Sequence, residues 1–453
     1  EVANSCRFND DDNPKMVVTP SSSGTNAGKI YTLSAWVKLG NIGVDKTIWS
    51  CSSDTYIYIS NAGVITCNFR RDGGTNYEYG SSRKLRDPSA WYHIVLRVDT
   101  TDSTDADKVQ VYVNGTEDTP TTTTYQNMAD DYETGANVSG VEQRIGVYSD
   151  GSLDFDGYMA EVIMVDNQSL APTEFGEYDE DTPTVWKPKD ISGISVGTNG
   201  YYLDFEDSSN LGNNAAGSGS ADLTETNLAA TDQSTDTCTN NFCTLNPLGG
   251  KKGNNTTFSE GNLKSVDTGS TNGVDPNLHA TFGLTAGSWY FEMKAEAITA
   301  GRMASIALLV QDGQGPDDYA DARTVNLYYE KNSSGNKIRK FSSDVETGLA
   351  DNAADDIFGV ALDIDNGTVQ FYKNGSTYGS QVTGLSSSGK TTFISMLGEG
   401  GSGRAATCNL NFGSPAFAIS SGNADGNGYG NFEHAVPSGF LALCTKNLGS
   451  DGG

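Results

Sequence analysis

The chain has 453 residues, which is long enough for two or three domains that each bury a core of their own. Acidic residues outnumber basic ones by 58 to 29, and the net charge of −29 excludes nucleic acid as a partner because such a surface repels phosphate. We interpret the acidity as favouring solubility in a salty environment, with a calcium-loaded surface as the alternative. Seven cysteines without a CxxC pair and three widely spaced histidines predict no zinc site. No run of 18 apolar residues occurs, so we expect no membrane span.

Short runs of alternating apolar and polar residues, separated by turn residues, predict an all-β fold. The predicted fold class is two antiparallel jelly-roll β-sandwiches joined by a connector rich in Gly, Ser and Asn. We place the first sandwich at residues 1–190, the connector at 191–255 and the second sandwich at 256–453.

Alternation also places the strands of the first sandwich. The predicted strands are 6–8, 16–19, 31–39, 47–51, 56–59, 64–69 and 157–165. A hairpin pairs residues 91–99 with 108–115, and residues 169–175 form the one predicted helical turn.

Four aspartates crowd the loop of this hairpin: Asp99, Asp102, Asp105 and Asp107. Hard oxygen ligands gathered on a loop could bind calcium, which is the one cofactor that the sequence suggests. An ordinary solvated polar loop is the alternative interpretation.

Four segments of the first region resemble, in the same order, the laminin G-like or concanavalin A-like jelly roll. They read YTLSAWVK, WYHIVLRVD, VQVYVNGTE and FDGYMAEVIMVDNQSLAPTEF. The resemblance implies a sandwich whose rim often binds calcium. Because jelly rolls of this type include glycoside hydrolases, it also requires a search for paired catalytic carboxylates.

The connector contains one alternating stretch, Tyr201–Glu206, which we expect to pair with a neighbouring sandwich. It also contains Gly193-Ile194-Ser195-Val196-Gly197, which fits the G-x-S-x-G pattern of a nucleophilic serine. That motif requires a strand before it and a long helix after it. A proline-rich segment and TNGYYLDF stand there instead, so we predict a linker.

The second sandwich is organised around the hairpin at residues 356–375, DIFGVALDIDNGTVQFYKNG. Val360, Leu362 and Ile364 alternate with polar or small residues, as in a half-buried strand. Asn366-Gly367 is predicted to supply two positive-φ residues for a tight turn, and Asn374-Gly375 a second turn. Further strands are predicted at 287–296, 305–310, 325–329 and 337–341.

GSWYFEMKAE, IFGVALDIDNGTVQFYKNG and NLNFG occur in the order found in SPRY domains, which this region resembles. The tail GYGNFEHAVPSGFLALCTKNL is similar to the closing segment of SPRY-like proteins of tailed bacteriophages. The connector phrases GYYLDFEDSSNLGNNAAG and NNFCTLNPL resemble linkers of phage tail-fibre and virion proteins. The resemblance implies a location on the surface of a virus particle but does not identify a ligand.

No complete catalytic pattern is present, so we predict no catalytic residue and no enzyme activity. The alternating pairs Asp363/Asp365, Asp204/Glu206 and Asp154/Asp156 all adjoin turns or the connector, where polar residues are ordinary.

Three weaker signals remain. Asn423-x-Asp425-x-Asn427-Gly428 fits the start of an EF-hand loop, but His434 stands at position twelve in place of glutamate. His93 alternates with apolar neighbours and is expected to be packed or hydrogen-bonded. Tyrosines at predicted loops (Tyr77, Tyr79, Tyr319) could stack on sugar faces, although Tyr is also an ordinary strand residue.

Our leading functional hypothesis is a non-enzymatic virion surface protein, such as a tail fibre, adhesin or capsid-decorating fibre. It would attach to a host-surface glycan or protein through its loops and contact other virion proteins. We expect a homo-oligomer, and a trimer if it is a tail fibre. The alternatives are a purely architectural virion component and a secreted polysaccharide hydrolase.

Overall fold

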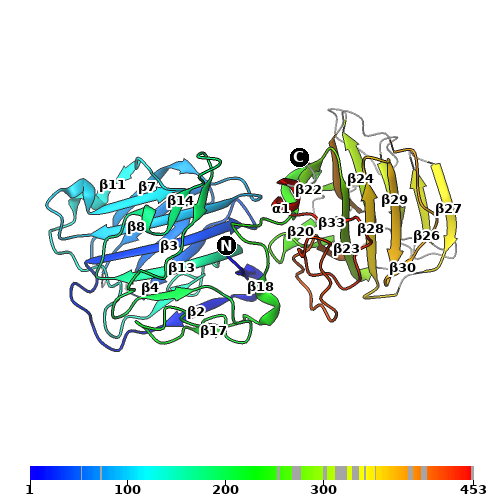
Figure 1. Cartoon of the computed structure of the whole chain (residues 1–453). Helices are drawn as coiled ribbons and strands as arrows, with labels where there is room; N and C mark the ends of the chain where they lie inside the picture. Colours follow the sequence, from blue (N-terminus) through cyan, green and yellow to red (C-terminus); the bar gives the residue numbers. More distant parts are fainter. Residues whose placement is uncertain are drawn as a thin grey trace. The chain divides into compact units, whose positions relative to one another are not determined.

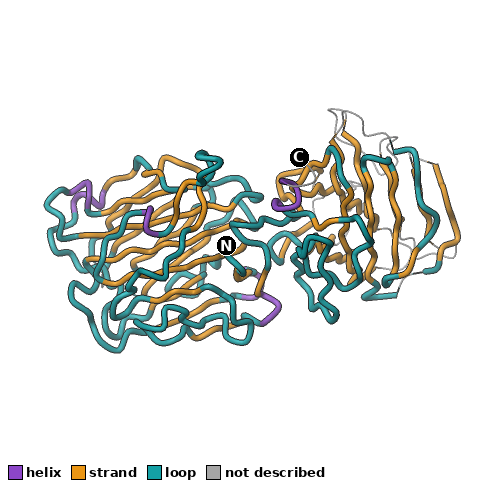
Figure 2. The backbone as a smooth tube through the Cα atoms, viewed as in Figure 1, coloured by secondary structure: helices purple, strands orange, loops and turns teal. Residues whose placement is uncertain are grey.

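The computed structural model describes residues 1–52, 54–71, 74–251, 256–267, 277–298, 304–311, 324–328, 336–340, 343–351, 353–385, 391–398 and 406–449. The chain divides into two compact units, Glu1–Thr239 and Asn240–Gly453 (Figure 1). Strands and loops make up nearly all of the described part of each unit (Figure 2), which confirms the all-β fold class. None of the helices in these ranges has the length and apolarity needed to cross a bilayer.

The first unit contains two eight-stranded antiparallel sheets. Sheet A has the order β10-β9-β8-β3-β13-β1-β18, with β16 also paired to β13, and sheet B the order β11-β7-β6-β5-β4-β12-β2-β17. The strands of sheet A are β1 (Ser5–Phe8), β3 (Ile30–Leu39), β8 (Trp91–Asp99), β9 (Val109–Val113), β10 (Thr116–Glu117), β13 (Gly157–Asp166), β16 (Tyr201–Leu203) and β18 (Gln233–Ser234). Those of sheet B are β2 (Lys15–Val18), β4 (Lys46–Cys51), β5 (Thr55–Ile59), β6 (Val64–Phe69), β7 (Tyr77–Lys84), β11 (Thr122–Thr123), β12 (Gln143–Ile145) and β17 (Thr224–Thr226).

The predicted strands of this region are all found, because alternate apolar residues from both sheets share one core. In β3, Leu33, Ala35 and Val37 are buried in that core, whereas Trp36 belongs to a separate apolar cluster. The predicted helical turn is reduced to a 3₁₀ turn at Pro172–Glu174.

The predicted connector differs most from the structure. Residues 191–239 belong to the first unit, where β16, β17 and β18 extend its sheets and Leu203, Leu211 and Leu223 enter its core. The expected pairing of the Tyr201–Glu206 stretch is confirmed by β16 against β13. Burial of these apolar side chains explains why the segment folds as part of the sandwich rather than as a free linker.

A two-stranded hairpin, β14 (Gly176–Tyr178) with β15 (Trp186–Pro188), also belongs to this unit. Its Trp186 packs in a cluster with Trp36, Trp91 and Tyr158, which face away from the main core. The outward side of sheet A is therefore covered in part by chain segments, and this cover shapes the cavity described below.

The second unit also contains two sheets. Sheet C has the order β19-β22-β31-β24-β25-β26-β27 and sheet D the order β20-β21-β32-β23-β28-β29-β30, with β33 parallel to β23. The strands of sheet C are β19 (Leu245–Lys251), β22 (Asn277–Leu284), β24 (Ala304–Gln311), β25 (Thr324–Tyr328), β26 (Asn336–Lys340), β27 (Ser343–Leu349) and β31 (Thr391–Gly398). Those of sheet D are β20 (Thr256–Ser259), β21 (Lys264–Asp267), β23 (Ser288–Ile298), β28 (Ile357–Asp363), β29 (Thr368–Lys373), β30 (Ser376–Thr377), β32 (Ala406–Asn411) and β33 (Leu441–Ala442), and a short helix α1 (Thr445–Asn447) follows.

The central hairpin of this unit forms as predicted, but its first turn differs. Val360 and Leu362 of β28 and Phe371 of β29 are buried in the core. Asp363 pairs with Thr368, so the loop has four residues, and only Gly367 has a positive φ (62°). A two-residue turn would require a positive φ at Asn366 as well, whereas this four-residue loop requires it only at Gly367. At the second turn both Asn374 (49°) and Gly375 (77°) do have positive φ.

Candidate functional site

Three of the four aspartates predicted to bind calcium are engaged in local hydrogen bonds or an ion pair. Asp99 Oδ1 accepts the backbone N–H and hydroxyl of Thr101, and Asp102 Oδ1 accepts the N–H of Thr104. Asp105 pairs with Lys108 at 2.7 Å. Asp107 is exposed.

Lys108 supplies the positive charge in this loop, because its ammonium lies 2.9 Å from Asp130 as well. Across the described ranges, no group of three or more His, Cys, Asp or Glu side chains could hold a metal ion. These contacts agree with the polar-loop interpretation, and calcium binding at this loop stays a prediction.

The second calcium signal, around Asp425, has a different explanation. Asp425 Oδ1 accepts the backbone N–H groups of Asn427 and Tyr429, and Oδ2 accepts those of Ala442 and the Asn447 side chain. A carboxylate that accepts four N–H donors organises the loop directly, without a cation.

In each of the three alternating carboxylate pairs, at least one member accepts a hydrogen bond from a backbone N–H. Asp363 accepts both the backbone and the side-chain N–H of Asn366, as expected for a turn residue. Asp204 Oδ1 accepts the N–H of Glu206. Asp156 is buried and accepts the N–H of Asn41 at 2.5 Å, and burial raises the pKa of its carboxyl to about 7.

Ser195 does not lie on a strand-to-helix turn. The chain continues from it through a turn into strand β16, and the Ser195 carbonyl accepts a hydrogen bond from Gln168. The nucleophile-elbow geometry requires a helix at that point, so the motif match is coincidental.

His93 is buried and hydrogen-bonded, as expected. The indole N–H of Trp186 donates to Nδ1 at 2.9 Å, so Nε2 carries the proton that is shared with Ser34 at 2.8 Å. Trp36 stacks on the same ring with centroids 4.7 Å apart. His93 thus attaches the β14–β15 hairpin to sheet A, and burial lowers its pKa to about 3.

This environment predicts a pH dependence of stability. The unfolded chain binds a proton at His93 below pH 6.5, whereas the folded chain does so only near pH 3. The free energy of unfolding therefore decreases as the pH falls from 6.5 towards 3. At pH 5 the loss relative to pH 8 is expected to be about 2 kcal/mol. Urea denaturation of the wild type and of His93→Gln at both pH values measures it, and parallel pH profiles for the two proteins would contradict it.

The tyrosines predicted to stack on sugars are placed differently. Tyr77 and Tyr79 lie in strand β7, and Tyr79 is buried with its hydroxyl donating to Asp118 at 3.1 Å. Tyr77 packs edge-on against Tyr132. Tyr319 lies outside the described residues.

Another set of tyrosines does form a half-exposed surface, on the outward side of sheet B. In β5, Ile57 and Ile59 enter the core, so Tyr56 and Tyr58 point to the opposite side, with ring centroids 5.5 Å apart. Tyr148 meets Tyr56 edge-on at 4.5 Å. We call the three rings, with the polar groups beside them, the tyrosine face. The alternation in TYIYI could have revealed the first two rings, but not Tyr148, which follows β12.

Polar groups border these rings. Asp54 accepts the Tyr148 hydroxyl at 3.1 Å and lies 3.7 Å from Arg70. Arg144 donates to Glu142 at 2.5 Å and to the Tyr148 carbonyl at 3.2 Å. Burial raises the pKa of Tyr56 and Tyr148, so both hydroxyls stay protonated at neutral pH.

This arrangement suits a polyhydroxylated ligand. Aromatic rings offer flat apolar surface to the C–H face of a sugar, while carboxylate, guanidinium and hydroxyl groups at the border can exchange hydrogen bonds with its hydroxyl groups. Because the rings already contact one another, little side-chain entropy would be lost on binding.

The two antiparallel sheets of the first unit form a concanavalin A-like jelly-roll fold. Residues 11–174 match the family model described as the concanavalin A-like lectin/glucanases superfamily. No curated protein matches the chain.

Several solved structures are similar in part. A candidate carbohydrate binding protein from Bacteroides ovatus has a TM-score of 0.33 and 18% identity, covering 50% of this chain and 60% of its own. A heptameric SAP-like pentraxin from Limulus polyphemus gives 0.28 and 16%, covering 38% and 79%. The SPRY domain of human HERC1 gives 0.26 and 12%, covering 33% and 87%. At these TM-scores the likenesses carry no argument about function.

Proposed function

We propose that the protein is a non-enzymatic attachment protein that binds host-surface glycans through the tyrosine face of its first unit. The observation that carries this proposal is the contact of Tyr56 with both Tyr58 and Tyr148 on an outward sheet surface. The match of residues 11–174 to a superfamily that includes lectins supports a binding role.

The biological setting in this proposal is the surface of a virus particle. Its support is the similarity of the predicted connector and of the tail to segments of phage virion proteins. On a particle, many copies would bind one cell, so weak affinity at each tyrosine face would be multiplied. The other virion proteins and the oligomeric state, including a trimer, belong to the same proposal.

Binding to a glycan array tests the proposal, followed by titration of the glycans that are retained. Tyr56→Ala and Tyr148→Ala are each expected to weaken binding about tenfold, because each removes one stacking surface. Tyr178→Ala is the matched control: Tyr178 is 48% exposed and contacts Trp186 edge-on, but lies on the β14–β15 hairpin.

Three outcomes would change the assignment. Equal weakening by Tyr178→Ala would remove the tyrosine face as the site. Failure to retain any glycan would favour the architectural role, particularly if the copy number in particles equals that of the main shell protein. Depolymerisation of a polysaccharide by the purified chain would establish the hydrolase alternative.

A further inference from the structure

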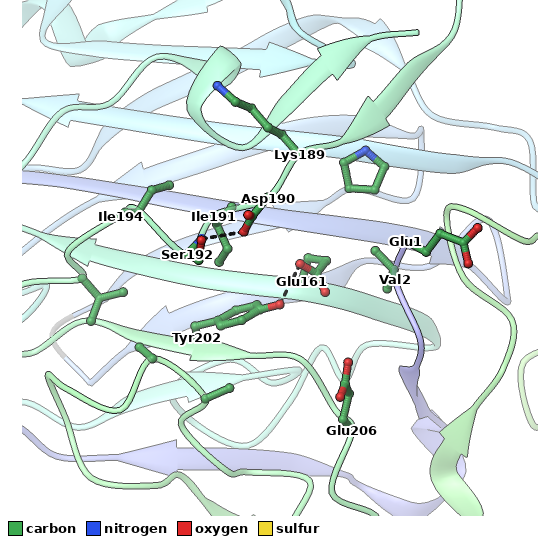
Figure 3. A pocket seen from close by; sticks show the side chains of 14 residues that line it. Glu1, Val2, Glu161, Lys189, Asp190, Ile191, Ser192, Ile194, Tyr202 and Glu206 are labelled. Atoms are coloured by element: carbon green, nitrogen blue, oxygen red, sulfur yellow. Dashed lines mark hydrogen bonds between the residues drawn. The ribbon is translucent and has the colours of Figure 1, made fainter.

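A cavity of about 500 Å³ lies over strands β13 and β16, in the same unit but outside the tyrosine face (Figure 3). One wall is apolar and includes Ile191, Ile194 and Val196. The rest includes the carboxylates of Glu161, Asp190 and Glu206. Its volume falls in the range of sites for small ligands.

Glu161 is placed in the cavity by an irregularity in β13. The register between β13 and β3 shifts between Ala160 and Ile163, and Glu161 has a φ of +48°. This bulge turns Glu161 out of the strict alternation, so that its carboxylate lies beside Tyr202, whose hydroxyl donates to Oε2 at 2.9 Å (Figure 3).

The Glu161 side chain is half-buried, and its carboxylate accepts one hydrogen bond from the protein. Within the described ranges, Tyr202 is its one hydrogen-bond donor, which leaves Oε1 without a donor. The pKa of Glu161 is raised to about 7, chiefly because the side chain is removed from water. The hydrogen bond from Tyr202 and the amino group of residue 1 act to lower this pKa, and the charges of Asp204 and Glu206 act to raise it.

The lysine in the lining does not neutralise these carboxylates. The ammonium of Lys189 donates to the Thr173 carbonyl at 3.1 Å, and its side chain points away from Glu161 in Figure 3. Asp190 accepts the backbone N–H of Ser192 at 2.9 Å. The cavity therefore combines an apolar wall with the half-buried carboxylate of Glu161 and the exposed carboxylates of Asp190 and Glu206. A ligand cation could donate to the Glu161 oxygen that Tyr202 does not occupy.

We propose that this cavity is a second ligand site. Its ligand is a small group that carries a protonated primary amine and, beside it, an apolar face. The ammonium donates to Glu161 Oε1, and the apolar face packs against the wall formed by Ile191, Ile194 and Val196. An amino sugar and a lysine side chain of a protein share this chemistry. The site does not depend on the tyrosine face.

Isothermal titration calorimetry of the full chain with glucosamine tests the proposal. N-acetylglucosamine is the neutral analogue, and Nα-acetyl-lysine methylamide represents a lysine side chain of a protein. Glucosamine is expected to bind at least tenfold more tightly than N-acetylglucosamine, because only the amine forms a charged hydrogen bond. Preference between glucosamine and the lysine amide identifies the source of the amine. Proton release at pH 7 is expected on binding, since a cation displaces the proton of Glu161.

Variants locate the binding. Glu161→Gln should weaken glucosamine binding at least tenfold, whereas Glu180→Gln, an exposed charge loss outside the cavity lining, should leave it unchanged. If Glu161→Gln does not fold, the affinities of the wild-type chain for glucosamine and N-acetylglucosamine still test whether the site requires an amine. Equal affinity for both sugars, no binding of either amine, or full binding by a folded Glu161→Gln variant would each overturn the proposal.

Discussion

Replacing Asp236 with alanine is expected to destabilise the first unit by about 3–5 kcal/mol. Asp236 lies 2.6 Å from the Lys38 ammonium, and each side chain is only 1% exposed. Its other oxygen accepts the indole N–H of Trp91 at 3.1 Å. Removal of the carboxylate leaves a buried ammonium without its counter-charge, which costs far more than the loss of one surface ion pair.

Urea denaturation of the full chain measures this effect through tryptophan fluorescence, since four of the five tryptophans lie in the first unit. The control is the double variant Lys38→Met with Asp236→Leu, which replaces the pair by apolar side chains and should recover most of the loss. A loss below about 1 kcal/mol for Asp236→Ala would show that water reaches Lys38, contrary to its burial in the structure.

The second large effect is expected at Glu292, in the second unit. Its side chain is fully buried and accepts the backbone N–H groups of His434 at 2.8 Å and of Glu433 at 3.0 Å. It also accepts the Asn411 amide at 3.2 Å. Glu292→Ala leaves these donors unsatisfied, and we expect a loss of about 3–4 kcal/mol.

Hydrogen exchange gives the local measurement for this variant. The amides of Glu433 and His434 should lose protection in Glu292→Ala, because the segment that they anchor to β23 is released first. Glu292→Gln retains one oxygen acceptor and should show a smaller loss. Unchanged protection of both amides in Glu292→Ala would mean that other contacts hold this segment.

The two sandwiches could be predicted because their strands obey a simple period. Leu33, Ala35 and Val37 alternate in β3, as do Val360 and Leu362 in β28, and both sets enter a core. The turn at Asn374-Gly375 follows from local chemistry in the same way. The extent of the first unit did not follow, because the burial of Leu211 and Leu223 depends on contacts with distant strands.

The binding surfaces were harder to predict for the same reason. Tyr56 and Tyr58 share a face by alternation, but their neighbour Tyr148 arrives from another part of the chain. Glu161 reaches its cavity through a bulge that interrupts the alternation. In the acidic loop, the ion pair of Asp105 with Lys108 is a contact that the sequence analysis did not predict.

A crystal structure of the full chain with a glycan selected on the array tests the central claim most directly. We predict a sugar ring packed on Tyr56 and Tyr148, with its hydroxyl groups near Asp54 and Arg144, and the glycan intact. A glycan bound elsewhere with the tyrosine face empty, or cleaved products held beside Glu161, would contradict the account of a non-enzymatic glycan-binding protein.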